Sequence, residues 1–312
     1  MIPKLDAQKI KQRDADTMAK LKLGIDSYGF LIVENTDISS AEILQVIDMY
    51  RAFFHLDPFE KARVDMAQTG SNRGWGAPQS EQVDPKANPD YKEVFDCGFE
   101  IDAADPMAQY SVYAPNMWPR TPNGFKDVIT GYYVKSMGVA LDLLSAIADV
   151  LECDSSYFDD KFSKPMALLR GNYYPARPSW AGENDYGIAE HTDYGCVTLL
   201  ASDGIAGLEA KTTSGDWIAI TAEPGEFIIN FGEMLEIWTN GRVRATPHRV
   251  RGTSQERISV PLFFNPNYDT NVASWGAQET VSAGEHLTKR FNETYLHLKD
   301  GSQPKAVAKL AS

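Results

Sequence analysis

The second half of the chain is a series of short apolar segments separated by turn residues, and this texture limits the folds that are open to it. Such segments are too short for ordinary helices, and their near-regular spacing is typical of β-strands. A succession of short strands of this kind favours a β-sandwich or a jelly roll. We expect strands over residues 166–174, 196–201, 207–211, 217–220, 226–231, 244–250 and 257–264.

The first half of the chain has the longer period of helices. Ser39 and Glu42 have the spacing of a capping box, and an apolar stripe at helical spacing follows them. A long helix is expected from Pro122 to about Leu151, because proline suits the first turn of a helix. Residues 66–120 are rich in Gly, Pro, Asn and Asp, and we expect this long stretch to wrap the body or cover a site.

A surface helix over residues 8–24 and a short buried strand over residues 29–33 complete this first half. We therefore expect one domain, mainly β with flanking helices, around a double-stranded β-helix (jelly-roll) core. Within this single domain of residues 1–312, we expect a helical N-terminal region over residues 1–160, a jelly-roll core over about 161–268 and a C-terminal helix over about 283–296.

Charge and cysteine content exclude several functional classes. The net charge is −13, from 43 acidic and 30 basic residues, and such a field repels the phosphates of nucleic acids. The three cysteines, Cys97, Cys153 and Cys196, are too widely spaced for a disulfide framework or a zinc knuckle. There is no apolar run of signal-peptide or membrane-spanning type. We expect a soluble cytoplasmic protein that acts on a small molecule; its oligomeric state is left open.

The strongest chemical pattern is formed by His191, Asp193 and His248. In an extended segment, residues i and i+2 point to the same face, so His191 and Asp193 present an imidazole and a carboxylate side by side. His248, in a later expected strand, is the candidate third ligand. Two histidines and one carboxylate form the facial triad of non-haem Fe(II) oxygenases, which leaves three coordination positions open. The competing interpretation is a surface His-x-Asp triplet and a hydrogen-bonded core histidine.

A second polar pattern lies in the last strong strand, where Arg257 and Ser259 share one face and apolar residues occupy the other. A guanidinium matches a carboxylate, so the pair is a candidate socket for one end of a dicarboxylic co-substrate. The alternative is an exposed edge strand, which Pro261 favours because proline is commonest at sheet edges. Asn172 and Tyr174 could hydrogen-bond the same co-substrate, or serve only as strand-end residues ahead of the next proline.

Together these residues resemble the isopenicillin N synthase-like family of Fe(II)/2-oxoglutarate-dependent dioxygenases. The likeness covers nearly the whole chain in order, and its pattern is specific only as a combination. It is carried by residues 172–175 (NYYP), 191–195 (HTDYG), 232–236 (GEMLE), 240–241 (NG), 247–250 (PHRV) and 257–259 (RIS), and earlier by 28–31 (YGFL), 53–54 (FF) and 116–119 (NMWP).

The resemblance implies an oxygenase that uses Fe(II), 2-oxoglutarate and O₂ and releases succinate and CO₂. By the same resemblance, His191, Asp193 and His248 would bind iron, and Arg257 and Ser259 would hold the distal carboxylate of 2-oxoglutarate. Asn172 and Tyr174 match positions that help to bind this co-substrate. The implied fold is the double-stranded β-helix.

Substrate contacts are expected from the irregular stretch before residue 120 and from the C-terminal region. The candidates are Arg170, Gln79, Phe95 and Phe264; for the two phenylalanines an ordinary core position is the favoured interpretation, and for Arg170 the two interpretations have equal weight. Three other functions stay open: a same-fold oxidase that does not consume 2-oxoglutarate, fragmentation of 2-oxoglutarate to ethylene, and a non-catalytic jelly-roll binding protein. A zinc-dependent enzyme is disfavoured, because catalytic zinc more often has three His or two His and a Glu. The sequence does not identify the substrate.

Overall fold

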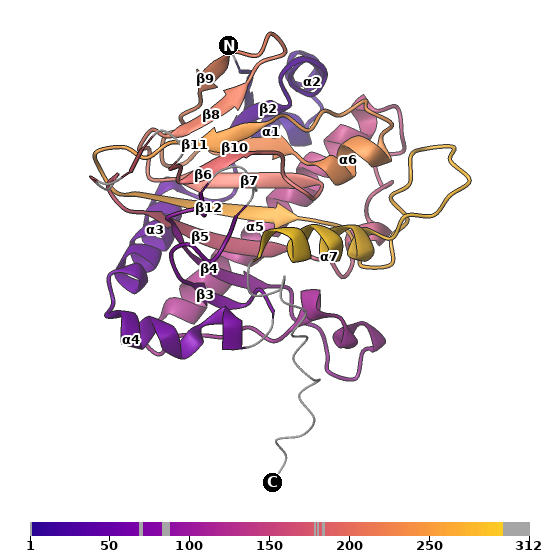
Figure 1. Ribbon diagram of the computed structural model, residues 1–312. Coiled ribbons are helices and arrows are strands. Elements are labelled where there is room, and N and C mark those ends of the chain that lie inside the picture. Colours follow the sequence, from indigo (N-terminus) through magenta and orange to yellow (C-terminus); the bar gives the residue numbers. More distant parts are fainter. Residues whose placement is uncertain are drawn as a thin grey trace.

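Two β-sheets that face each other form the centre of the molecule (Figure 1). The computed structural model describes residues 2–68, 71–82, 88–177, 179, 181–182 and 185–295. Within these ranges, the large sheet has eight strands in the order β1-β2-β10-β7-β12-β5-β4-β3, and the small sheet has four in the order β6-β11-β8-β9. This arrangement is the expected jelly roll with flanking helices.

Most strand bounds in the second half follow the sequence expectations, but the strand expected over 244–250 begins only at His248, and β6 was not among the expected strands. The large sheet comprises β1 (Lys4–Asp6), β2 (Phe30–Glu34), β3 (Gly74–Gly76), β4 (Glu93–Gly98), β5 (Leu168–Tyr174), β7 (Val197–Ser202), β10 (Phe227–Phe231) and β12 (Arg257–Phe264). The small sheet comprises β6 (Ile188–His191), β8 (Leu208–Lys211), β9 (Trp217–Ala219) and β11 (His248–Val250). Except for the parallel pair β1 and β2, neighbouring strands in these sheets run antiparallel.

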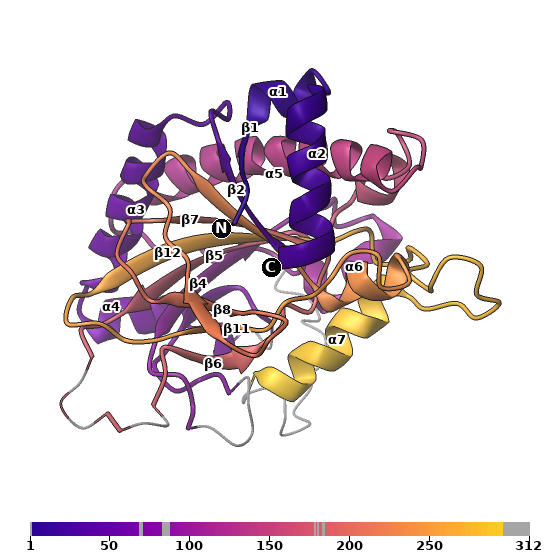
Figure 2. The ribbon, with the colours of Figure 1, turned by 90° about the horizontal axis from the view of Figure 1, so that it is seen from above.

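The longer N-terminal helices cover one face of the large sheet, and the small sheet and α7 lie on its other face (Figure 2). The helices are α1 (Ala7–Lys11), α2 (Ala15–Leu23), α3 (Ser40–Phe54), α4 (Pro58–Lys61), α5 (Phe125–Val150), α6 (Glu233–Trp238) and α7 (Ala283–Thr294), with a π-helical turn at Gly24–Tyr28 and short 3₁₀ turns at Ala62–Val64, Met66–Gln68, Pro106–Gln109, Ser111–Tyr113 and Asp160–Phe162. Residue 296, the last of the expected C-terminal helix, lies outside the described residues.

The capping box predicted at the start of α3 is confirmed. The Ser39 side chain accepts from the Glu42 backbone N–H, while the Glu42 carboxylate accepts from the Ser39 N–H, so two orphan donors of the helix end are satisfied. Tyr50 and Phe53 on the buried face of α3 pack against Phe95 and Phe125, which joins this helix to β4 and α5 in one aromatic core. Burial of such rings dominates core energetics.

The expected helix over residues 8–24 is interrupted. Arg13 has a positive φ of 55°, and Asp14 then caps a new helix by accepting from the Thr17 N–H. A non-glycine residue in this backbone region cannot continue a helix, so α1 and α2 are separate. The sequence pattern showed the apolar spacing but not the break.

The interpretation of the last strand as a sheet edge was wrong. β12 lies between β5 and β7, and Pro261 is opposite Leu200 of β7 in the interior of the large sheet. The region expected to be irregular also contributes β3 and β4, and β4 pairs along its length with β5. The segment expected to be helical therefore supplies β1 to β4, and both halves of the chain build the large sheet. No helix within the described residues is long and apolar enough to cross a membrane.

Candidate metal centre and pocket

Pairing of β6 with β11 brings two of the predicted metal ligands together. His248 is directly opposite His191 in the register, and their rings are 4.3 Å apart between centroids. Asp193 Oδ1 lies 3.8 Å from His191 Nε2 and 3.6 Å from His248 Nε2. One ligand atom from each residue lies within 4.8 Å of the others, so the three can bind one cation. The facial arrangement predicted from the sequence is therefore present.

Each histidine is held with Nε2 directed to this shared point. His191 Nδ1 is 2.8 Å from the carbonyl oxygen of Ala189, and His248 Nδ1 is 3.1 Å from that of Thr246. A backbone acceptor at Nδ1 favours the tautomer whose Nε2 lone pair is free for a metal. Burial and the neighbouring His248 lower the pKa of His191, which keeps this imidazole neutral, as metal binding requires.

The carboxylate of Asp193 is fixed by two polar side chains of the large sheet. Thr198 Oγ1 and Asn230 Nδ2 both donate to Asp193 Oδ2, the latter over 2.6 Å, which leaves Oδ1 for a metal. Burial alone would raise the pKa of Asp193, but the two histidines and these hydrogen bonds lower it. Sequence reasoning missed Thr198 and Asn230. Their signal was a polar residue within a largely apolar strand.

Arg257 is a buried cation that lacks an acidic partner among the residues that the structure describes. Its side chain is only 3% exposed, its Nε donates to the Ile205 carbonyl oxygen over 3.1 Å, and its guanidinium lies 5.2 Å from the ring of Tyr174. Nη1 is buried and has no hydrogen-bond partner within the same ranges. An unpaired buried guanidinium is costly, so this position fits a carboxylate supplied by a ligand.

Ser259 and Asn172 lie beside each other on the same face of the large sheet. They are opposite each other in the register of β12 and β5, and Asn172 Nδ2 is 3.4 Å from Ser259 Oγ. Asn172 Oδ1 is buried without a partner among the described residues. Tyr174 is opposite Arg257 in the same pair of strands. The four residues predicted to bind a co-substrate are thus neighbours, with buried polar atoms still available to a ligand.

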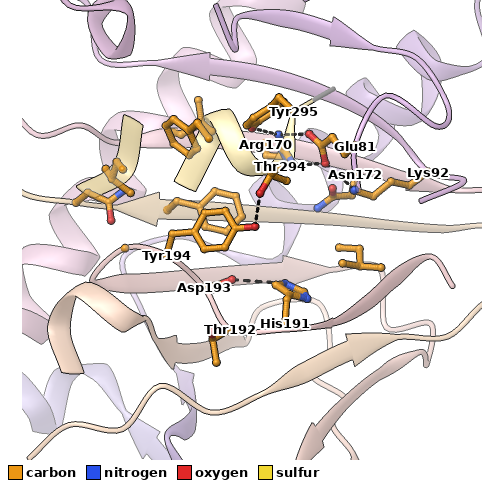
Figure 3. Close-up of a pocket in the computed structure, with 17 residues that line it drawn as sticks. Glu81, Lys92, Arg170, Asn172, His191, Thr192, Asp193, Tyr194, Thr294 and Tyr295 are labelled. Atoms are coloured by element: carbon orange, nitrogen blue, oxygen red, sulfur yellow. Dashed lines mark hydrogen bonds and ion pairs between the residues drawn. The ribbon is translucent and has the colours of Figure 1, made fainter. Parts of the chain in front are cut away.

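A cavity of about 90 Å³ opens next to the metal ligands, with room for several water molecules and hence for a portion of a small organic molecule. Figure 3 shows His191 and Asp193 on one side of it and Arg170, Glu81 and Lys92 on the other. Its lining includes apolar side chains from β5, β12 and α7: Leu168, Phe263, Leu287 and Phe291.

The four predicted substrate contacts differ in where they lie. Arg170 lines the cavity, whereas Gln79 is exposed and does not belong to the lining. Phe95 and Phe264 are fully buried on the opposite face of the large sheet, Phe264 against Phe162 and Phe95 within the aromatic core. Their assignment to the pocket was wrong because alternate residues of a strand point to opposite faces, so that Phe263 lines the cavity in place of Phe264.

Arg170 belongs to a buried charged network that the sequence did not reveal. Its Nε and Nη2 donate to the two oxygens of Asp96 over 2.7 and 2.6 Å, and its Nη1 donates to Glu81 over 3.0 Å. Lys92 donates to Glu81 over 2.7 Å and to Asp90 over 2.8 Å. Charged side chains this deeply buried are rare unless paired, and the network closes one wall of the cavity.

Helix α7 anchors the loop that carries Asp193. His286 Nε2 lies 3.0 Å from the Tyr194 carbonyl oxygen, and Tyr194 Oη is 2.5 Å from Thr294 Oγ1 at the end of the helix. Glu233, at the start of α6, accepts from Thr192 over 2.5 Å and from Arg290 of α7 over 3.0 Å. The last described helix therefore positions the metal-binding loop as well as lining the cavity.

The fold and the three ligands define a class: a jelly-roll metalloprotein with a two-histidine, one-carboxylate site, as in non-haem iron oxygenases. Family models agree with this class. Residues 165–266 match the 2OG-Fe(II) oxygenase superfamily, and residues 2–121 match the non-haem dioxygenase in morphine synthesis N-terminal family.

Individual proteins show the same relationship. A 2-oxoglutarate-Fe(II) type oxidoreductase of Aspergillus fumigatus is 31% identical, over 77% of this chain and 74% of its own. Homoarginine-6-hydroxylase 2-ODD-C23 of Glycine max is 32% identical over 84% and 81%. A full-length Neurospora crassa protein, solved in complex with α-ketoglutarate, is similar with a TM-score of 0.83 and 27% identity, over 94% of this chain and 96% of that one. The same Neurospora crassa protein has also been solved with both α-ketoglutarate and thymine.

The chain belongs to the 2OG-Fe(II) oxygenase superfamily, as an isopenicillin N synthase-like, non-haem dioxygenase that depends on Fe(II) and 2-oxoglutarate. His191, Asp193 and His248 form its facial triad. The available Arg257 Nη1 donor fits a carboxylate of a dicarboxylic co-substrate, so the residues present agree with this chemistry.

Proposed function

We propose that this enzyme hydroxylates or otherwise oxidises a small molecule held in the cavity beside the triad, and that Arg257 and Ser259 hold the distal carboxylate of 2-oxoglutarate. The observation that carries the proposal is the buried Arg257 guanidinium, whose Nη1 has no partner among the described residues. A same-fold oxidase could use this cation to hold another anion, so the release of succinate is the measurement that separates the two functions.

Each group of residues has a separate role in the proposed reaction. His191, Asp193 and His248 hold the metal by one face and leave the opposite positions open. Asn172 and Tyr174 flank the co-substrate on the large sheet, and Arg170 lies where it can contact the substrate. When bound, Fe(II) with 2-oxoglutarate and O₂ supplies the oxidising power, and the co-substrate leaves as succinate and CO₂. The protein orients the reactants and excludes water from the site.

The substrate class proposed is a small molecule rather than a nucleic acid or a membrane. A net charge of −13 disfavours a phosphate backbone, and the cavity suits a small ligand. Two relatives support a compact substrate, because one is named a homoarginine hydroxylase and the Neurospora crassa protein has been solved with thymine. A cytoplasmic location, expected from the cysteine usage, stays a prediction.

The test begins with the anaerobic addition of Fe(II) and then of 2-oxoglutarate to the protein. Formation of the chelate is measured by its weak visible absorption band. We expect this band with the unmodified chain and no band after His191→Ala or Asp193→Ala. Succinate is then measured during aerobic turnover with candidate substrates. Oxygen uptake with product but without succinate would instead support the oxidase that does not consume 2-oxoglutarate.

A further inference from the structure

A network of buried charged side chains lies beside the cavity. Three carboxylates, Glu81, Asp90 and Asp96, face two cations, Lys92 and Arg170, and none of these five residues is more than 7% exposed. Charges at this depth are screened only weakly by solvent. Of these five residues, Glu81, Lys92 and Arg170 line the cavity, so Glu81 is the carboxylate that a ligand meets in this wall.

Another buried cation, Arg73, lies near this network. It comes close enough to Asp96 to oppose the effect of burial on the Asp96 carboxyl pKa. Its hydrogen bonds, however, go to Asn72 and to the Val112 carbonyl oxygen, and Arg73 is not among the residues that line the cavity. It balances the charge of the region without presenting a cation to a ligand.

Glu81 keeps one oxygen for a ligand. Lys92 and Arg170 Nη1 both donate to Oε2. Oε1 lies 2.8 Å from Arg170 Nη2, but the two hydrogens of Nη2 are directed to Asp96, over 2.6 Å, and to the Tyr295 hydroxyl, also over 2.6 Å. Oε1 consequently receives no hydrogen bond from the described residues.

Glu81 is also in the correct place and charge state to contact a substrate. It lines the same cavity as His191 and Asp193, and Figure 3 shows it across that cavity from them. Burial opposes its ionisation, but Arg170 and Lys92 outweigh this and lower the pKa of Glu81 to about 2. A buried, ionised acceptor without a donor is unfavourable until a ligand supplies one.

We propose that the substrate donates an N–H to Glu81 Oε1 and carries no negative charge at that end, so that it is a nitrogen base or a cyclic amide whose apolar portion contacts Phe263 and Phe291. This inference rests on the proposed function, because it assumes that the cavity beside the triad is the substrate site. Spare hydrogens on Lys92 Nζ and Arg170 Nη1 are available to an acceptor next to the donated N–H, as in an amide.

The experiment compares three probes of the same size on the full-length protein loaded anaerobically with Fe(II) and 2-oxoglutarate: benzamidine, benzamide and benzoate. Binding is measured by calorimetry and by the change in the visible band of the chelate. We expect benzamidine or benzamide to bind at least about tenfold more tightly than benzoate, the scale of one hydrogen bond to a charged group. Tighter binding of benzamidine identifies a cationic substrate, and tighter binding of benzamide a neutral amide.

Glu81→Gln keeps the size of the side chain and removes its charge. We expect this variant to bind benzamidine about tenfold more weakly, so that its affinities for benzamidine and benzoate become more similar. The matched change Glu60→Gln, on exposed α4, should leave both affinities unchanged. If the glutamine variant does not fold, the same binding measurements are made on Glu81→Asp, which keeps the charge but shortens the side chain.

The outcomes separate the two proposals. Benzoate binding as tightly as the other probes, or no detectable binding of benzamidine and benzamide, overturns the assignment of Glu81 while the chelate band still supports the proposed function. Absence of the band from the unmodified chain refutes the proposed function itself.

Discussion

Replacing Arg257 with methionine should separate co-substrate binding from stability. The side chain is 3% exposed and is held by one hydrogen bond to Ile205, so its charge is largely uncompensated without a ligand. Methionine fills a similar volume without a charge. We therefore expect the free energy of unfolding of the ligand-free Arg257→Met protein to be unchanged or higher.

The same substitution should greatly weaken the binding of 2-oxoglutarate. Removing one partner of a buried hydrogen-bonded charge pair costs about 2–5 kcal/mol of binding, or roughly a 30- to 5000-fold increase in Kd. At a concentration of 100 times the original Kd, 2-oxoglutarate stabilises the unmodified protein by about 2.7 kcal/mol. With a Kd raised about 100-fold, that stabilisation falls to about 0.4 kcal/mol.

The assay is urea unfolding with and without 2-oxoglutarate, together with anaerobic calorimetry of the Fe(II)-loaded protein. The control is Arg242→Met, because Arg242 is exposed, donates to the Leu151 carbonyl oxygen and packs on Trp275 away from the cavity. We expect the control to bind 2-oxoglutarate normally. An Arg257→Met protein with the original Kd would refute the role of this cation.

Three further changes test other regions of the structure. Thr198→Val removes a donor to Asp193 and should weaken Fe(II) binding about 10- to 100-fold in competition with a colorimetric chelator; unchanged affinity would contradict this. The pKa of Glu81 is lowered from 4.5 to about 2, so its ionisation contributes stability that is present above pH 4.5 and lost as the pH falls towards 2. Glu81→Gln should therefore flatten the dependence of the free energy of unfolding on pH in that window; the same slope in both proteins would contradict this contribution of Glu81. Phe264→Ala should cost about 3–5 kcal/mol in urea unfolding and Phe263→Ala less, because only Phe264 is fully buried; the reverse order would be inconsistent with the described packing.

The metal ligands could be predicted from sequence because their chemistry and their spacing coincide. His191 and Asp193 are two residues apart in an extended segment, and two-residue alternation is a property of the backbone alone. The same rule places Arg257 and Ser259 on one face. The same alternation places Phe264 on the opposite, apolar face of the strand, so the sequence pattern itself disfavoured Phe264 as a pocket residue, and the side chain is fully buried.

Other features depend on contacts between distant segments of the chain. Glu81 and Lys92 lie in a stretch without periodicity, and nothing local indicates that they meet Arg170 of β5. Pro261 suggested an edge because its missing N–H is a local property, whereas its central place depends on which strands pair on either side. Sequence patterns thus predicted most strands of the second half and the metal ligands, and tertiary pairing decided the pocket wall.

The two histidines of the triad and the proposed carboxylate anchor lie on different sheets, and under the proposed function this division has a consequence for selectivity. His191 and His248 belong to the small sheet and Arg257 to the large one, and a compact set of apolar residues that includes Leu208, Ile228 and Val250 packs in a cluster that draws on both. If Arg257 anchors the distal carboxylate, as we propose, this packing between the sheets helps to set the separation of metal and anion. Evolution could therefore retune the enzyme towards shorter or longer 2-oxo diacids by changing side chains that never touch them.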